Sequence, residues 1–168
     1  MFLIDLSGWL SSAIALLLLT LQLPAVMVLL SRLLKGPTRR PPLQPRPATP
    51  EQRGAVSVVV PTLNEVARLG PCLEGLSQQT EEVREILIVD SRSQDGTRDL
   101  VKAAQAQESR LRLMTDEPLP PAWVGRPWAL HHGYLHSSAE SEWILGLDAD
   151  TQPQAGLVPD LMAAAAAE

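Results

Sequence analysis

The chain has 168 residues, a net charge of −5 at pH 7 and a single cysteine, Cys72. Residues 1–54 carry six basic and two acidic residues, whereas residues 55–168 carry eight basic and 17 acidic residues. The acidic second part argues against nucleic-acid binding, which needs a basic face to meet phosphates. One cysteine excludes an intrachain disulfide bond, and a reducing compartment fits this composition.

The first element in chain order is an apolar stretch from Trp9 to Leu34, in which Arg32 is the only charged residue. Because about 22 to 25 helical residues match a hydrocarbon core of roughly 30 Å, we expect residues 1–35 to form a transmembrane anchor. The alternatives are a cleaved signal peptide and a buried helix, but Asp5 precedes the stretch and basic residues follow it. The positive-inside rule predicts a single-pass anchor in the plasma (inner) membrane, with the C-terminal domain in the cytoplasm.

Residues 36–53 contain six prolines among arginine, glutamine and threonine. This composition is typical of an extended, largely unpacked linker. Its arginines would either contact anionic headgroups or simply be solvated. We therefore expect a Pro-rich basic linker between the anchor and the domain that follows.

From residue 54 onward, apolar strands alternate with helices. Strands are expected at 55–60, 85–89, 110–114 and 143–147, and helices at 65–79, 97–108, from 127 and at 157–167. Near-continuous apolar strands in this alternation indicate a mostly parallel sheet with helices on both faces. Residues 54–168 are therefore predicted to form one α/β domain.

Polar residues follow three of these strands, at Pro61–Glu65, at Asp90 and at Asp148 with Asp150. A lone aspartate at a strand end is more often a turn former, but parallel sheets bind ligands beyond the carboxyl ends of their strands. If Asp148 and Asp150 continue the fourth strand, alternation points both to the same side. Two like charges so close repel unless they ligate a divalent cation. The three clusters together predict a metal site for a phosphate-bearing substrate.

Other kinds of site have little support in the sequence. The first strand is not followed by a glycine-rich dinucleotide fingerprint, and no P-loop or nucleophile elbow occurs. His132 and His136 have the spacing of a metal pair on a helix. No third ligand supports that pair, so an ordinary helix face is the preferred interpretation.

Three segments carry a resemblance to a known family: Val60–Glu65, Val89–Thr97 and Leu147–Asp150. In order and spacing they resemble the nucleotide-sugar half of family 2 glycosyltransferases, which have the Rossmann-like GT-A fold. The resemblance covers about residues 54–168. Leu119–Leu130 is similar to a loop of membrane-anchored bacterial members linked to hopanoid and carotenoid glycosylation.

The resemblance implies that Pro61, Thr62 and Glu65 line a nucleoside pocket. It also implies that Asp90 contacts the base, typically uracil, whereas Asp95 organises the turn before a helix. Members of the family often have a second aspartate where this chain has Ser91, so one base or ribose contact differs.

The same resemblance places Asp148 near the ribose and the metal, and Asp150 on a Mn²⁺ or Mg²⁺ ion that bridges the diphosphate. Arg126 would meet phosphate oxygens, although family members often have lysine there. Trp123 or Trp128 would stack on sugar or lipid, or simply pack the loop on the core.

The implied activity is inverting transfer of a hexose from a nucleoside-diphosphate sugar, with a UDP-sugar expected, to a lipid-like acceptor. The catalytic base of such an enzyme is expected after Glu168, so the 168-residue chain alone is predicted to be inactive. The alternative is a catalytically inactive fragment that acts at most as a membrane-tethered nucleotide-binding or interaction module.

Overall fold

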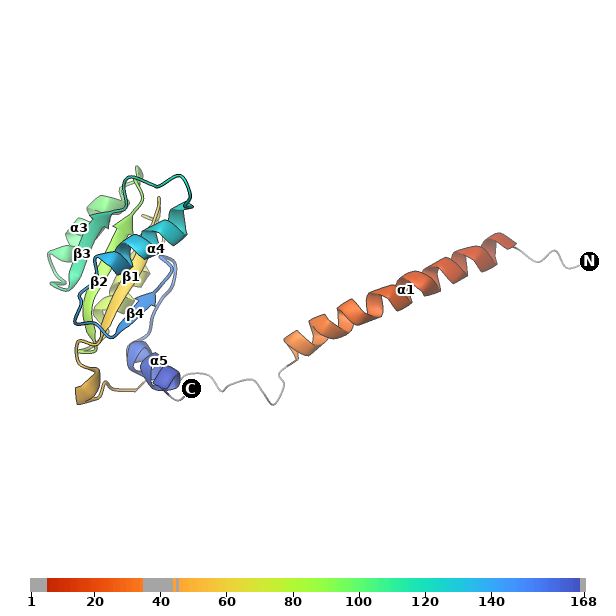
Figure 1. Ribbon diagram of the computed structural model, residues 1–168, viewed down its shortest axis with the longest axis horizontal. Coiled ribbons are helices and arrows are strands. Elements are labelled where there is room, and N and C mark those ends of the chain that lie inside the picture. The colour runs from red at the N-terminus through yellow and green to blue at the C-terminus, as the bar shows by residue number, and fades with distance from the viewer. Residues whose placement is uncertain (1–5, 35–43, 45, 167–168) are drawn as a thin grey trace, which may run out of the picture. The chain divides into compact units, whose positions relative to one another are not determined.

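The computed structural model describes residues 6–34, 44 and 46–166. The chain divides into two compact units, Met1–Pro42 and Leu43–Glu168, and each is described by itself (Figure 1). The helices and strands, in chain order, are α1 (Leu6–Leu33), a 3-10 turn (Pro50–Gln52), β1 (Val56–Thr62), α2 (Leu69–Ser77), β2 (Val83–Asp90), α3 (Thr97–Gln105), β3 (Leu111–Thr115), α4 (Gly125–Leu135), β4 (Trp143–Gly146) and α5 (Leu157–Ala166).

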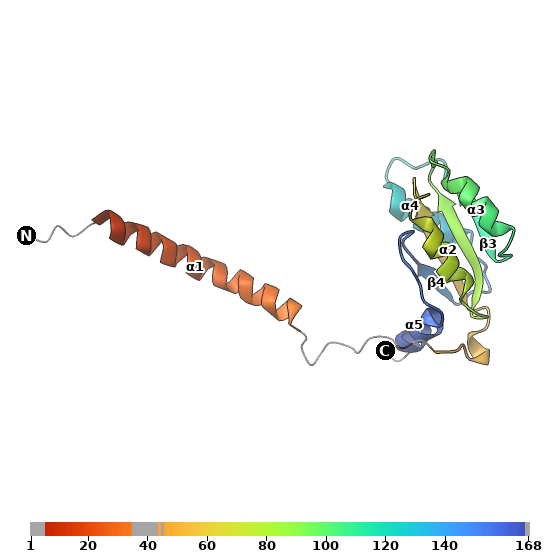
Figure 2. The same ribbon diagram turned by 180° about the vertical axis from the view of Figure 1, so that it is seen from behind.

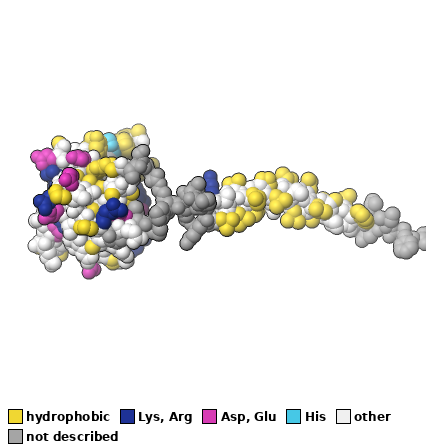
Figure 3. Space-filling model, turned by 90° about the horizontal axis from the view of Figure 1, so that it is seen from below, with side chains coloured by type: hydrophobic (Ala, Val, Ile, Leu, Met, Phe, Trp, Pro, Cys, Tyr) yellow, Lys and Arg dark blue, Asp and Glu magenta, His cyan; other side chains and the backbone are white. Residues whose placement is uncertain are grey.

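Helix α1 is apolar over nearly its whole length. Its segment Gly8–Leu33 has a mean hydropathy of 2.5, and hydrophobic side chains occur along its length (Figure 3). The hydroxyls of Ser12 and Thr20 donate to the carbonyls of Gly8 and Leu16, so these polar groups are satisfied within the helix. The predicted helix is confirmed, and by length and composition it can cross a membrane.

The second unit is built on a parallel four-stranded sheet in the order β3-β2-β1-β4. The two central strands are almost fully buried and consist mainly of valine, isoleucine and leucine, as expected for strands covered on both faces. Among the described residues β4 pairs only with β1, and Trp143 at this edge is 41% exposed. The predicted parallel α/β sheet is confirmed.

Alternate residues of the central strands pack on opposite faces. Val58 and Ile88 belong to the larger core, which includes residues of α2, α3 and α5, and Figure 2 shows α2 and α3 on this face. Val59 and Leu87 belong to a smaller core with Ala129 of α4, which lies on the opposite face in Figure 1. This alternation fixes which strand-end side chains point toward which helices.

Helix α2 begins at Leu69, four residues later than predicted. Asn64 adopts a left-handed conformation with φ 56°, and the backbone N–H groups of Glu65 and Val66 donate to Thr97 and Asp95 instead of starting a helix. Pro71 in the first turn lacks an N–H and therefore fits the later start. The loop before α2 consequently spans the carboxyl edge of the sheet.

The end of the predicted linker contacts the domain. Arg46 forms an ion pair of 2.6 Å with the buried Asp160 of α5, and the Gln52 side chain donates to the Pro159 carbonyl. The extended spacer therefore does not include residues 46–53. The rest of the prediction falls mostly on residues 35–43 and 45, which lie outside the described part of the chain.

Gly75 of α2 gives a test of the packing behind the carboxyl edge. A Cβ atom at Gly75 would lie 2.3 Å from the Pro153 carbonyl oxygen, whereas one at Gly70 would meet nothing within 4 Å. Gly75→Ala should therefore lower the free energy of unfolding by about 1–3 kcal/mol despite its better helix propensity. Gly70→Ala, the control in the same helix, should be neutral or stabilising. Guanidinium unfolding of the full chain in detergent, followed by tryptophan fluorescence, measures both. Equal stability of the two variants would contradict the close approach.

Glu85, at the amino end of β2, is a buried carboxylate whose charge is compensated. Burial raises its pKa, but hydrogen bonds from the Ser138 backbone (2.5 Å), the Ser57 hydroxyl (2.8 Å) and Arg112 (2.5 Å) outweigh burial and leave the pKa below its usual value. A lowered folded-state pKa stabilises the fold above the unfolded pKa, and this stabilisation is lost as the pH falls through the folded value.

We therefore expect the unfolding free energy of the wild type to fall as the pH drops below the ordinary glutamate value of 4.5. Near neutral pH, Glu85→Gln should have a lower free energy of unfolding than the wild type. As the pH falls, this free energy should decrease less steeply in the variant than in the wild type. Glu74→Gln, at an exposed position of α2, is the matched control. Denaturant titrations between neutral and acidic pH measure these slopes, and an unchanged slope in Glu85→Gln would refute the role of the carboxylate.

Candidate functional site

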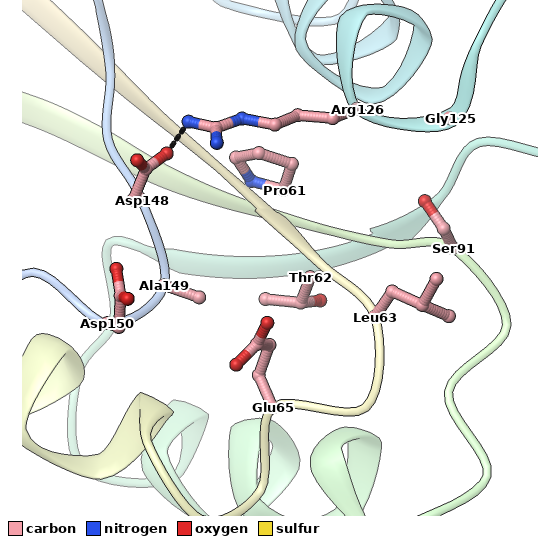
Figure 4. A pocket seen from close by; sticks show the side chains of 10 residues that line it. All are labelled: Pro61, Thr62, Leu63, Glu65, Ser91, Gly125, Arg126, Asp148, Ala149 and Asp150. Carbon is pink, nitrogen blue, oxygen red and sulfur yellow. Dashed lines mark ion pairs between the residues drawn. The ribbon is translucent and has the colours of Figure 1, made fainter. Parts of the chain in front are cut away.

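A cavity of about 260 Å³ lies at the carboxyl edge of the sheet (Figure 4). Its walls come from the end of β1 and the following loop, the end of β2, the start of α4 and the turn after β4. The residues that line it are Pro61, Thr62, Leu63, Glu65, Ser91, Gly125, Arg126, Asp148, Ala149 and Asp150. Parallel strands thus deliver side chains from distant parts of the sequence to one place.

Asp148 and Asp150 lie in a turn rather than on the strand. Strand β4 ends at Gly146, and the Thr151 N–H donates to the Asp148 carbonyl at 3.0 Å. Strand alternation is therefore not the reason that both carboxylates face the cavity, as the sequence prediction assumed. Instead, the buried Ala149 between them anchors the turn against the larger core.

Cys72 of α2 lies directly behind this turn. Its thiol contacts the Asp148 carbonyl at 3.8 Å, and burial, with a smaller effect of Asp150, raises the pKa of the thiol to about 11. A thiol with such a pKa stays protonated and unreactive near neutral pH. Cys72 is thus a buried packing residue.

Arg126 places a positive charge opposite the aspartate turn. It lies at the start of α4, and its guanidinium forms an ion pair with Asp148 (Figure 4). The two side chains are 60% and 45% exposed, so solvent screens the pair and it contributes little to stability. An incoming anion can therefore replace Asp148 as the partner of Arg126 at a small cost in free energy.

Glu65 points into the centre of the cavity from the loop after β1 (Figure 4). Arg68 lies 2.9 Å from its carboxylate, and the Glu65 backbone N–H donates to the Thr97 hydroxyl at 2.9 Å. The structure therefore brings together six of the seven predicted site residues: Pro61, Thr62, Glu65, Arg126, Asp148 and Asp150.

Asp90, the seventh, does not line the cavity. It is fully buried, and its oxygens accept from the Ser93 N–H at 3.1 Å and the Thr62 hydroxyl at 3.4 Å. Arg98 of α3 lies 3.8 Å away. Asp90 thus holds the start of the loop after β2.

The loops after β1 and β2 are joined by side-chain hydrogen bonds. Asp95 accepts from the N–H and hydroxyl of Thr97 and from the Val66 N–H, at 2.6–3.0 Å. These bonds, first of all that of the Thr97 hydroxyl, lower the pKa of Asp95. The Asn64 side chain accepts from the Gln94 N–H, and the Asn64 backbone N–H donates to the Ser93 hydroxyl. Asp95 therefore organises the turn before α3, as the resemblance implied.

Asp116 was not among the predicted site residues. It follows β3, is 4% exposed, and lines a second cavity of about 400 Å³ together with Ser91. Its carbonyl accepts from the Trp128 indole N–H at 2.5 Å. The signal was available, because Asp116 comes directly after the third strand and hence at the same sheet edge.

The remaining aromatic and histidine candidates pack on one another. Trp123 stacks on His131 with ring centroids 4.8 Å apart, and His132 stacks on His136 at 4.2 Å. Burial and then His136 lower the pKa of His132. Within residues 6–34, 44 and 46–166, no cluster of three or more His, Cys, Asp or Glu side chains could hold a metal. A cation at Asp148 and Asp150 would need further ligands from the substrate or water.

Comparisons with known proteins agree with this arrangement. The family model "Glycosyl transferase family 2" matches residues 57–168. The lipopolysaccharide core biosynthesis glycosyltransferase LpsC of Rhizobium meliloti is 33% identical over 115 residues, which are 65% of this chain and 37% of LpsC. The 4,4'-diaponeurosporenoate glycosyltransferase of Staphylococcus haemolyticus is 29% identical over 61% of this chain and 26% of its own length. The chain thus spans well under half of these relatives.

Solved structures share the fold. Mannosyltransferase PcManGT from Pyrobaculum calidifontis, in complex with GDP-Man and Mn²⁺, is 26% identical with a TM-score of 0.59, covering 82% of this chain and 39% of that one. Glucosyl-3-phosphoglycerate synthase of M. tuberculosis is 25% identical with a TM-score of 0.55, covering 72% and 45%. With a family model matched over most of its length and a GT-A-type parallel sheet, the chain belongs to glycosyl transferase family 2.

Proposed function

We propose that this chain binds a nucleoside-diphosphate sugar through a divalent cation, as the donor side of an enzyme that transfers a hexose with inversion to a lipid-like hydroxyl. The observation that carries the proposal is the cavity in which Asp148, Asp150 and Arg126 meet the loop after β1. The Mn²⁺ and GDP-Man bound by PcManGT support a metal and a nucleotide sugar here.

Asp148 and Asp150 suit Mn²⁺ or Mg²⁺, which prefer carboxylate oxygens and complete their shells with phosphate oxygens and water. When bound, the cation would offset the negative charge that develops on the departing nucleoside diphosphate. Only two carboxylates are needed, because the diphosphate supplies ligands of its own. The donor set therefore fits the ion.

Arg126 would bind the diphosphate directly. Its present partner, Asp148, would turn to the cation when donor and metal enter together, which frees the guanidinium for phosphate oxygens. Two new interactions, that of Asp148 with the cation and that of Arg126 with the phosphate, would thus replace the Arg126–Asp148 ion pair. Glu65, held by Arg68, would face the nucleoside or the sugar from the floor of the cavity.

We assign the catalytic base to none of these carboxylates. Asp148 and Asp150 are committed to the cation, and Glu65 is paired with Arg68. A general base must lie within hydrogen-bond reach of the acceptor hydroxyl, which is a property of the acceptor side.

We also propose that α1 anchors the domain to the plasma membrane. Its apolar segment Gly8–Leu33 is long enough to span a bilayer. Basic residues follow the segment while Asp5 precedes it, which favours a cytoplasmic second unit. A membrane location would also bring the donor site to a lipid-like acceptor.

Replacement of Asp150 tests the metal role. Asp150→Asn should weaken Mn²⁺-dependent UDP binding by at least about tenfold, since even outer-shell changes at metal sites have effects of that size. Asp99→Asn, at an exposed aspartate on α3, should bind as the wild type does. Isothermal titration calorimetry of the full chain in detergent, with Mn²⁺ and with a chelator, measures the affinities. Equal affinity with and without metal would refute the cation site.

Replacement of Asp95 tests whether its hydrogen bonds position the loops after β1 and β2. Asp95→Ala removes the acceptor of the Val66 and Thr97 N–H groups, so these amides should exchange faster with deuterium. Nucleotide affinity should fall as well, because Glu65 is held through Thr97. Asp99→Ala should change neither quantity. Unaltered exchange at Val66 in Asp95→Ala would show that the loops are positioned by other contacts.

A further inference from the structure

We propose that the outer face of α4 docks on the surface of a phospholipid bilayer and holds the donor cavity near the lipid headgroups. The face is formed by α4 and the two residues before it, and consists of Trp123, Val124, His131, Tyr134 and Leu135. The inference rests on the proposed membrane anchor α1, which would bring a bilayer close to the domain. It goes beyond the anchor, because it gives the domain a membrane contact of its own.

Helix α4 places small residues on the sheet and large ones on its outer side. Ala129 and Gly133 are buried, and a Cβ atom at Gly133 would collide with a valine of β1. Because a helix has about 3.6 residues per turn, positions 131, 134 and 135 lie on the opposite side. Tyr134 and Leu135 are 56% and 57% exposed, and no other described element covers this side of α4 in Figure 1. A helix that faces water normally has charged residues there.

Aromatic rings join the outer face of α4 into one surface. Trp123 stacks on His131 with ring centroids 4.8 Å apart, and His131 lies 6.2 Å from Tyr134. Val124, next to Trp123, is 69% exposed. Five of the nine exposed large hydrophobic side chains described outside α1 lie in this part of the chain: Leu119, Trp123, Val124, Tyr134 and Leu135. An exposed apolar patch of this kind indicates an interaction surface.

The segment that forms this face contains no acidic residue. Residues 118–139 have neither Asp nor Glu, although residues 55–168 contain 17 acidic residues. The carboxylates beside α4 are not free: Asp116 and Glu85 are at most 7% exposed, and Asp148 is paired with Arg126. A bilayer with anionic lipids has a negative surface potential, which repels exposed carboxylates. The outer face of α4 is therefore the part of this acidic domain that can approach such a bilayer.

The chemistry of the face matches that of lipid headgroups. Among the described residues, neither the Trp123 indole N–H nor the Tyr134 hydroxyl has a hydrogen-bond partner. Phosphate and ester oxygens of phospholipids accept hydrogen bonds, and tryptophan and tyrosine are enriched where a membrane meets water. Two copies packed through this face would set it against itself, without a carboxylate to pair with its donors. A bilayer therefore fits this face better than a second copy.

The length of the chain keeps the domain near the bilayer that would hold α1. Helix α1 ends at Leu33, and Arg46 is held on α5 by its ion pair with Asp160. The chain between these points spans at most about 45 Å, at roughly 3.5 Å per residue. Such a tether gives a high effective concentration, so a weak affinity of the face for lipid is sufficient for docking.

Docking would also bring the donor cavity to the membrane surface. Arg126, which lines that cavity, lies at the start of α4 and only two residues after Val124 of the outer face. A lipid-like acceptor would present its hydroxyl at the level of the headgroups. The docked domain would therefore hold the donor sugar where that hydroxyl lies.

Quenching by brominated lipid tests the docking. The full chain with Trp9→Phe, which removes the tryptophan of α1, is placed in nanodiscs of phosphatidylcholine, brominated on its acyl chains, and phosphatidylglycerol in equal amounts. Trp123 should be quenched, because it would contact the bilayer. Adding Trp123→Phe should therefore remove most of the quenchable fluorescence. Adding Trp143→Phe, at a tryptophan of β4 that is 41% exposed against 38% for Trp123, should leave the quenching in place.

A charge on the outer face gives a second test. Leu135→Glu should lower the ratio of docked to undocked protein by at least about fivefold, the effect of one charge near an anionic surface. Ala103→Glu, which adds the same charge at an exposed position of α3, should have no effect. An undiminished quenching in Trp123→Phe or in Leu135→Glu would overturn the inference.

The same samples separate the docking from the anchor. A chain that elutes with the nanodiscs but whose Trp123 is not quenched would overturn the docking and leave the anchor standing. Trp123 that is shielded from acrylamide yet unquenched by brominated lipid would assign the face to a protein partner, and would also overturn the docking. A chain that does not enter nanodiscs would overturn both proposals.

Discussion

The parallel pairing of β1 with β2 is the constraint on which the rest of the structure depends. Thr62 pairs with Asp90 in register, so both strands end at the same level and release their loops over the same edge. The strands are buried on both faces, which leaves no freedom to shift the register without exposing apolar residues. The position of the cavity follows directly from this pairing.

The sequence predicted the order of elements and the edge at which the site lies, because apolar strand runs and polar strand ends are local signals. Six of the seven predicted site residues line the cavity, and Asp90 does not. Asp90 lies on the same strand face as Ile86 and Ile88, which pack in the larger core, so it points toward α3 and Arg98. The alternation of side chains along β2 predicts the direction of Asp90 once the last residue of the strand is known.

Two other differences have similar physical origins. The start of α2 was predicted too early because the Glu65 and Val66 N–H groups donate to Thr97 and Asp95, about 30 residues away. Asp116 was not among the predicted site residues, although β3 ends immediately before it. At the start of α2, contacts between distant segments outweighed the local pattern.

The charges of the cavity explain why metal and nucleotide should bind together. Arg126 compensates Asp148 and Arg68 compensates Glu65, but no described residue forms an ion pair with Asp150. A diphosphate adds further negative charge to a site that already has an uncompensated carboxylate, so its entry alone is opposed. A divalent cation alone must compete with Arg126 for Asp148. When both enter, the cation takes the two aspartates and Arg126 takes phosphate oxygens, so each ligand removes the obstacle to the other.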